Sequence, residues 1–224
     1  MISLSRNSEA MHGRTMLRSI AASFIACALS MPASPADAQN CGWSHVDHRV
    51  NYDASGVWNP NVYRSIVGAL TVAQVGGALW EGSESRFGKT LWQGIDSEII
   101  GGVGATAGKY IFTRVRPSTE DNPCLWFQGH SNYSFPSGEA AVAAALVTPY
   151  IIEYGGDDPA VYALLLLPLY VGAGRIKNQA HWQTDVLAGW TVGALSGWYA
   201  HQRDVPIMIE LLPHGVAVGM KAKF

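Results

Sequence analysis

Basic residues in the middle of the chain are spaced so that they could bind one anion. Lys109 and Arg116 are seven residues apart, so on an expected helix they project from one face, two turns apart. Arg175 stands at the end of a later expected helix. Between them, Pro136-Ser137-Gly138 opens another helix, whose free N–H groups, hydroxyl and positive dipole end suit a phosphate-sized anion. These residue types predict a phosphate site.

A histidine and an aspartate could supply a nucleophile for that anion. His181 and Asp185 are four residues apart at the start of an expected helix, so the carboxylate can reach one imidazole nitrogen. Such a contact fixes the tautomer and leaves the other nitrogen free to attack. Taken singly, each of these residues is more often structural, because a helix-end cation usually just complements the helix dipole. The order of all these residues along the chain, taken together, favours a catalytic role over a structural one.

Four further polar residues lie near these segments without belonging to the pattern. Arg114 and Lys177 are expected to be solvated charges. His130 and Tyr133 precede the Ser137 turn, and either line a pocket or fill a loop.

Together the three segments resemble the signature of the type-2 phosphatidic acid phosphatase and vanadium haloperoxidase superfamily. In chain order they are Lys109-x6-Arg116-Pro117, Pro136-Ser137-Gly138 and Arg175-x5-His181-x3-Asp185. Order and internal spacings match, and His-Trp-Gln-Thr-Asp from His181 to Asp185 is similar to the version found in the phosphatases.

The resemblance implies phosphoryl transfer in two steps. His181 would attack phosphorus to form a phosphohistidine, with Asp185 orienting the ring, and water would then hydrolyse that intermediate. The phosphate oxygens would be held by fixed donors from Lys109, Arg116, Ser137, the Gly138 N–H and Arg175. The phosphatase branch implies no metal ion and no other cofactor, whereas a haloperoxidase would bind vanadate.

Two residues depart from the family pattern. Glu139 stands where the family usually has a histidine that protonates the leaving oxygen. A carboxylic acid can do this only if it keeps its proton near the working pH, and a cage of cations favours the ionised form. Glu139 is therefore expected to be an acid suited to low pH, or to a phosphate leaving group, or to mark a site that turns over slowly. Gly174 replaces a common serine, which is a smaller change.

The elements that must position these residues are mainly helical. Apolar residues recur at helical intervals over five segments, after which a Pro206 break leads into an expected short β-hairpin. The expected helices are 63–80, 85–115, 137–154, 159–177 and 181–203, and the hairpin strands are 207–212 and 216–224. The fold class is thus a mainly α bundle of about five helices with a short C-terminal hairpin. The domain boundaries are 39–60 for an irregular surface arm, 61–204 for the helical phosphatase-like domain and 205–224 for the hairpin and tail.

The first 38 residues read as a cleaved signal peptide. Arg14 and Arg18 precede an apolar stretch, and Ala36-Asp37-Ala38 supplies the small residues that a signal peptidase reads. An uncleaved anchor is the alternative, although the stretch is short for a bilayer span, which needs about 20 apolar residues. Cleavage leaves Cys41 and Cys124, an even pair that favours one disulfide in an exported protein.

Composition excludes several classes of protein. Only 14% of residues are charged, against about 25% in an average soluble domain, and 48% are hydrophobic, which disfavours disorder and nucleic-acid binding. The net charge of −2 gives no global attraction for anions, so an anion must be held by locally clustered cations.

These observations predict an exported, periplasmic or envelope-associated phosphatase that acts on a phosphate monoester or pyrophosphate. A lipid substrate and contact with a membrane surface are preferred because charge is sparse and the helices are apolar. Three alternatives remain: a soluble periplasmic acid phosphatase on small phosphate esters, a vanadate-dependent haloperoxidase, and a non-catalytic phospholipid-binding envelope protein.

Overall fold

The computed structural model describes Cys41 and residues 45–203, 207–212 and 215–220. The predicted signal peptide, 1–38, lies outside the described residues. The helices are α2 (Pro60–Glu81), α3 (Arg86–Phe112), α4 (Gly138–Tyr154), α5 (Leu166–Lys177) and α6 (Gln183–His201), with short 3-10 helices η2 (Gly56–Trp58) and η3 (Pro159–Leu165). Strands β1 (Ile207–Leu212) and β2 (Gly215–Met220) pair antiparallel, with Ile207 opposite Met220. The mainly α class predicted from the sequence is confirmed.

Local sequence signals set where the helices begin and end. Asn59 and Ser85 cap α2 and α3 with side-chain oxygens that accept from backbone N–H groups of the first turn, and Pro60 fills the position where no N–H is needed. The expected single helix 159–177 is instead η3 followed by α5. Pro168 explains the break, because its ring would clash with the carbonyl four residues earlier in a continuous α-helix.

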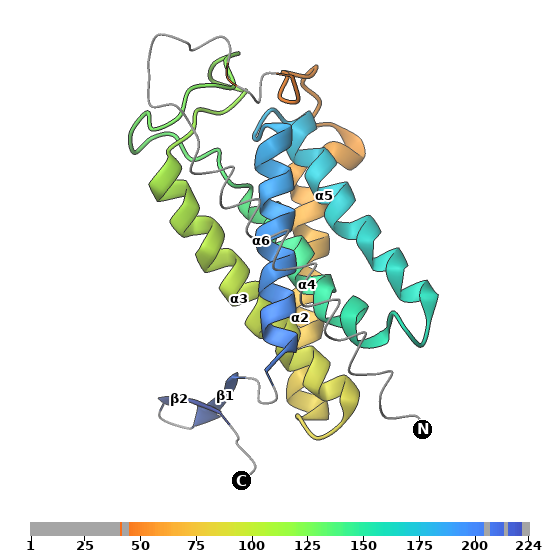
Figure 1. Ribbon diagram of the computed structural model, residues 1–224. Coiled ribbons are helices and arrows are strands. Elements are labelled where there is room, and N and C mark those ends of the chain that lie inside the picture. The colour runs from red at the N-terminus through yellow and green to blue at the C-terminus, as the bar shows by residue number, and fades with distance from the viewer. Residues whose placement is uncertain (1–40, 42–44, 204–206, 213–214, 221–224) are drawn as a thin grey trace, which may run out of the picture. The chain divides into compact units, whose positions relative to one another are not determined.

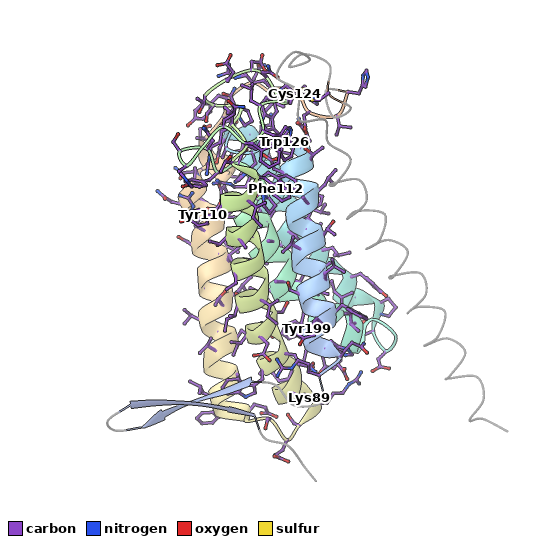
Figure 2. The ribbon with its side chains drawn as sticks, turned by 60° about the vertical axis from the view of Figure 1, so that its left-hand side comes forward. Lys89, Tyr110, Phe112, Cys124, Trp126 and Tyr199 are labelled. Carbon is purple, nitrogen blue, oxygen red and sulfur yellow. A yellow bond between two sulfur atoms is a disulfide. The ribbon has the colours of Figure 1, made fainter. Side chains whose placement is uncertain are left out.

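Helices α3, α4 and α6 lie side by side, and α2 and α5 pack beside α3 and α4 (Figure 1). Tyr110, Phe112, Cys124 and Trp126 mark one end of this bundle, whereas Lys89 and Tyr199 lie toward the opposite end (Figure 2). The first end carries the long loop 113–137, which joins α3 to α4.

The tightest packing in the bundle is between α4 and α6. Three glycines at intervals of four residues, Gly189, Gly193 and Gly197, line the face of α6 that meets α4. A Cβ added at Gly193 would lie 2.2 Å from the Ala141 carbonyl oxygen, and one at Gly189 would lie 2.4 Å from that of Ser137. Only residues without a side chain allow this approach, so the glycines fix the distance between the start of α4 and the start of α6.

A disulfide ties the N-terminal arm to the long loop. Cys41 and Cys124 are bonded across 83 positions of sequence, with a Cα–Cα distance of 5.7 Å. Most described residues of the arm are exposed, but Asp47 within it is buried.

Two of the described helical stretches are long and apolar enough to cross a membrane by length and composition. They are Pro60–Glu81 and Pro159–Lys177, and only 17% and 28% of their most apolar windows are buried against the rest of the protein. Their exposed apolar side chains include Val72, Leu79, Trp80 and Leu166.

We expect Gly193→Ala to lower the free energy of unfolding by about 2 kcal/mol or more, because the added methyl group overlaps the backbone of α4. Urea unfolding measures the change. Gly102→Ala is the matched control: it is also within a helix, but its Cβ would meet nothing closer than 3.8 Å, so it should gain up to about 1 kcal/mol from helix propensity. Equal stability of the two variants would contradict the close packing of α4 on α6.

Candidate active site

The structure brings the residues singled out in the sequence to one end of the bundle. Lys109 is in the last turn of α3 and Arg175 in the last turn of α5, while Ser137 caps α4. Lys109 Nζ donates to the carbonyls of Tyr133 and Pro136, each at 2.9 Å, which holds the ammonium beside the start of α4. Ser137 N donates to the Asp185 carbonyl at 2.9 Å, so the starts of α4 and α6 are joined directly.

His181 lies in the short loop between α5 and α6, and it is 2% exposed. Its Nδ1 lies 2.6 Å from the Ser134 carbonyl and 3.7 Å from Asp185 Oδ2. The nearer partner of the imidazole is therefore the carbonyl and not the carboxylate expected from the spacing of four residues. Since a carbonyl accepts only, Nδ1 carries the proton, and Nε2 has the lone pair that a nucleophile needs.

Burial and neighbouring charge keep this imidazole neutral. Burial, together with the cations of Arg175 and Lys109, lowers the pKa of His181 to about 3, although Asp185 acts in the opposite direction. Burial alone would raise the pKa of Asp185, but Arg114, His181 and Ser134 hold it at about 2. At neutral pH the pair is a neutral imidazole next to a carboxylate, which suits nucleophilic attack.

Three cations surround the site. Burial lowers the pKa of Lys109 to about 8, and the charges of Arg116 and Arg175 contribute. Burial and Arg175 also lower the pKa of Arg116, whose Nη2 donates to the Tyr133 carbonyl at 3.3 Å. Lys109 and Arg116 both donate to the Tyr133 carbonyl, so these two cations lie close together, and an anion bound beside them would relieve their repulsion.

A buried donor of Arg175 points to a ligand. The residue is 5% exposed, and among the described residues its Nε has no hydrogen-bond partner. Leaving a buried donor unsatisfied costs about 1 to 3 kcal/mol, so such a donor inside a cage of cations favours an acceptor that is supplied by an anion.

Glu139 shares the cage with two arginines. Its Oε2 lies 2.5 Å from Arg175 Nη1, in an ion pair without well-directed hydrogen-bond geometry, and its Oε1 accepts from Arg64 Nε at 2.7 Å. Arg64 comes from α2 and has no place in the sequence pattern. The carboxylate therefore forms ion pairs with two cations at the edge of the site and accepts a hydrogen bond from Arg64.

The expectation that Arg114 is a solvated charge is wrong. Its side chain is fully buried, with Nη1 2.6 Å from Asp185 Oδ1 and Nη2 2.6 Å from Asp47 Oδ2. Two buried carboxylates and the rings of Trp126 and Trp182 replace water around the guanidinium. Tyr133 contributes its backbone carbonyl to the cage, whereas His130 is exposed.

Sequence reasoning missed four residues of the site: Asp47, Arg64, Arg114 and Ser134. Arg114 stands inside the first segment of the pattern, but its burial depends on Asp47 and Asp185, which are distant in the sequence. Asp47 and Arg64 meet the site only through the fold, across separations of 67 and 75 residues, so no local spacing could indicate them.

Comparison with known proteins places this arrangement in a family. Residues 93–206 match the PAP2 superfamily, and the chain belongs to it. That range contains all three segments of the pattern, but neither Asp47 nor Arg64.

The relatives are phosphatases that act on lipids according to their names. A lipid A 1-phosphatase of Porphyromonas gingivalis is 35% identical over 120 residues, which is 53% of this chain and 24% of that protein. An undecaprenyl-diphosphatase of Sulfolobus acidocaldarius is 30% identical over 116 residues, which is 49% of this chain and 51% of that protein. The chain therefore spans a quarter to a half of these relatives. A crystal structure of Aquifex aeolicus LpxE aligns with 65% of this chain and 88% of its own at 22% identity, with a TM-score of 0.43.

We expect the site to bind sulfate, a tetrahedral anion whose charge is constant across the pH range tested. Calorimetry should find an affinity that holds from acidic to neutral pH and falls as the pH rises through about 8, because Lys109 then loses its proton. Lys109→Met should weaken binding at neutral pH by about tenfold or more and remove the fall.

The matched control for this measurement is Lys177→Met, which removes the last cation of α5, a residue that lies beside Asp53 of the arm. It should leave both the affinity and the pH dependence unchanged. A fall in affinity that persists in Lys109→Met would show that another group is responsible.

Proposed function

We propose that the protein is a phosphatase that removes a phosphate group from a lipid through a phosphohistidine intermediate. The observation that carries the proposal is a neutral, buried imidazole set among Lys109, Arg116 and Arg175, with a donor of Arg175 left unpartnered. A nucleophile inside a cage of fixed cations is the arrangement that phosphoryl transfer requires.

In the first step, His181 Nε2 attacks phosphorus and the bond from phosphorus to the leaving oxygen breaks. The ring becomes positively charged, and the Ser134 carbonyl and Asp185 stabilise that charge from the Nδ1 side. In the second step water attacks the phosphohistidine, the P–N bond breaks, and phosphate leaves with the imidazole neutral again. Lys109, Arg116 and Arg175 supply positive charge to the phosphate oxygens throughout, so we propose a reaction that needs no metal ion.

We propose that Glu139 is the side chain that lies next to the leaving oxygen of the substrate. Its oxygens are paired with Arg64 and Arg175, so at the leaving oxygen the group offers negative charge and two neighbouring cations and not the imidazolium of the family pattern. Departure of an alkoxide would therefore need acidic conditions, whereas a diphosphate substrate releases a phosphate that needs little protonation.

We expect His181→Ala to abolish phosphate release while the far-UV circular dichroism stays close to wild type, because the ring lies in a loop and not in one of the helices. Incubation of wild type with a ³²P-labelled substrate and rapid alkaline quenching should trap an acid-labile label on the protein that His181→Ala lacks. Retained turnover in His181→Ala would remove the proposed nucleophile. A wild-type protein that binds phosphate without releasing it from any ester would favour the non-catalytic alternative.

An apolar cavity supports a lipid substrate. It has a volume of about 680 Å³ and is lined by side chains from α2, α3, α4, η3 and α5, including Leu70, Ala73, Leu146 and Tyr170. Arg64 and Glu139 stand on two of the same helices. Leu70 is six residues from Arg64 and Leu146 seven from Glu139, which is about 9 to 11 Å along an α-helix. A lipid with its phosphate in the cage could place an acyl chain here.

Exported location and membrane contact complete the proposal. The names of the relatives, the Cys41–Cys124 disulfide and the exposed apolar residues of α2 and α5 all support a protein of the cell envelope that meets a lipid surface.

We expect Ala73→Trp to discriminate between long and short substrates, because the indole would fill the cavity. For a lipid phosphate with long acyl chains, kcat/KM should fall about tenfold, the equivalent of about two buried methylene groups. For a short-chain phosphate ester it should not change. Val72→Trp adds the same ring at the adjacent, 72% exposed position of α2, outside the cavity lining, and serves as the control. Equal losses for both substrates would argue against an acyl site in this cavity.

A further inference from the structure

The N-terminal arm reaches into the buried region behind the catalytic pair. Asp47 is 3% exposed, and its carboxylate accepts from Arg114 Nη2 at 2.6 Å, from Thr184 N at 2.8 Å and from Thr184 Oγ1 at 2.6 Å. Thr184 directly precedes Asp185. One carboxylate from the arm therefore holds both the arginine that binds Asp185 and the backbone next to it.

The same arm also runs along the loop that carries His181. His48 N donates to Gln183 Oε1, and Gln183 Nε2 donates back to the His48 carbonyl at 3.0 Å. Arg49 Nε donates to Gln179 Oε1, and Gln179 Nε2 donates to the Val50 carbonyl at 2.7 Å. Residues 179 and 183 flank His181 on both sides, so the arm fastens the loop before and after the histidine.

The disulfide joins the arm to the loop segment that binds Arg114. Cys41 is six residues before Asp47, and Cys124 follows Pro123, whose carbonyl accepts from Arg114 Nε and Nη2. Arg114 is thereby held by Asp47, Asp185 and Pro123 and lies over the Trp126 ring at 4.3 Å. With so many fixed partners the guanidinium cannot move without breaking a buried contact.

We propose that Asp47 is a positioning residue of the active site, acting through Arg114 and Thr184 to hold Asp185 and His181 in the geometry for attack on phosphorus. The inference rests on the proposed function and assigns a catalytic purpose to the arm, which the family pattern does not include. Asp47 touches neither the cations of the cage nor the imidazole, so it sets the orientation of the nucleophile and not the affinity for phosphate.

The test compares Asp47→Asn with Asp53→Asn, a control on the same arm whose carboxylate accepts from Ser55. With a soluble phosphate ester, Asp47→Asn should lose about 10- to 100-fold in kcat with KM little changed, because a misplaced nucleophile slows the chemical step. Asp53→Asn should match wild type. Unchanged kcat in a folded Asp47→Asn protein would overturn the proposal.

A second readout does not need turnover. In ¹H–¹³C spectra of the histidine rings, the signal of His181 is identified by its absence from His181→Ala. In wild type this signal should report a neutral ring down to about pH 3. In Asp47→Asn its pKa should move up toward the ordinary value, because a loosened loop admits water to the ring. A ring that titrates as in wild type would overturn the proposal. This measurement also separates the two ideas: if wild type releases no phosphate, the proposed function fails, while the titration still decides the role of Asp47.

A variant that leaves every buried charge in place covers the case in which Asp47→Asn does not fold. Cys41→Ser/Cys124→Ser frees the arm and keeps Asp47, Arg114 and Asp185. Its kcat should also fall, but by less than in Asp47→Asn, and the pKa of the His181 ring should again move up. Wild-type kcat and titration in this folded variant would overturn the proposal.

Discussion

The central constraint on the site is electrostatic. The fold holds Lys109, Arg116 and Arg175 together in a largely buried region, where the three cations repel one another. Burial and mutual charge lower the pKa of both Lys109 and Arg116, which means that the protonated forms are less stable there than in solution. Helix ends and loop carbonyls fix these groups in place regardless. A tetrahedral dianion bound among these groups would remove the repulsion and accept from the unpartnered donor of Arg175, so the arrangement suits the charge that develops in phosphoryl transfer.

Such a cage holds its geometry only if the elements that carry it cannot separate. The glycines of α6 bring its backbone against α4, and Ser137 N bonds directly to the Asp185 carbonyl. Arg114 adds a second fastening, because it joins Asp185 to the long loop and to the N-terminal arm. Backbone packing thus fixes the starts of α4 and α6, and a buried ion-pair network fixes Asp185 from the side of Arg114 and Asp47.

The sequence was sufficient for the helical class, and the cations that it singled out lie at one end of the bundle in the structure, because both the class and the grouping depend on local spacing. Lys109 and Arg116, Pro136 to Gly138, and His181 with Asp185 are each neighbours on one short segment. The burial of Arg114 and the presence of Asp47 and Arg64 depend on contacts between distant segments, which one sequence does not encode as a period or a spacing. The same limit explains His181, whose nearest partner is a backbone carbonyl: any residue at position 134 offers that carbonyl, so its type gives no signal.

Glu139 changes the balance of charge at the site as well as the supply of protons. A histidine at this position, as in the family pattern, would carry a positive charge when ready to donate a proton, and would add to the repulsion among Lys109, Arg116 and Arg175. A carboxylate does the reverse, since it draws in Arg64 from α2 and offsets part of the positive charge. The exchange therefore replaces the histidine of the family pattern with an acidic side chain and places a fourth cation, Arg64, at the edge of the cage. That trade suits a substrate whose leaving group is itself anionic, because such a group needs a positive partner more than it needs a proton.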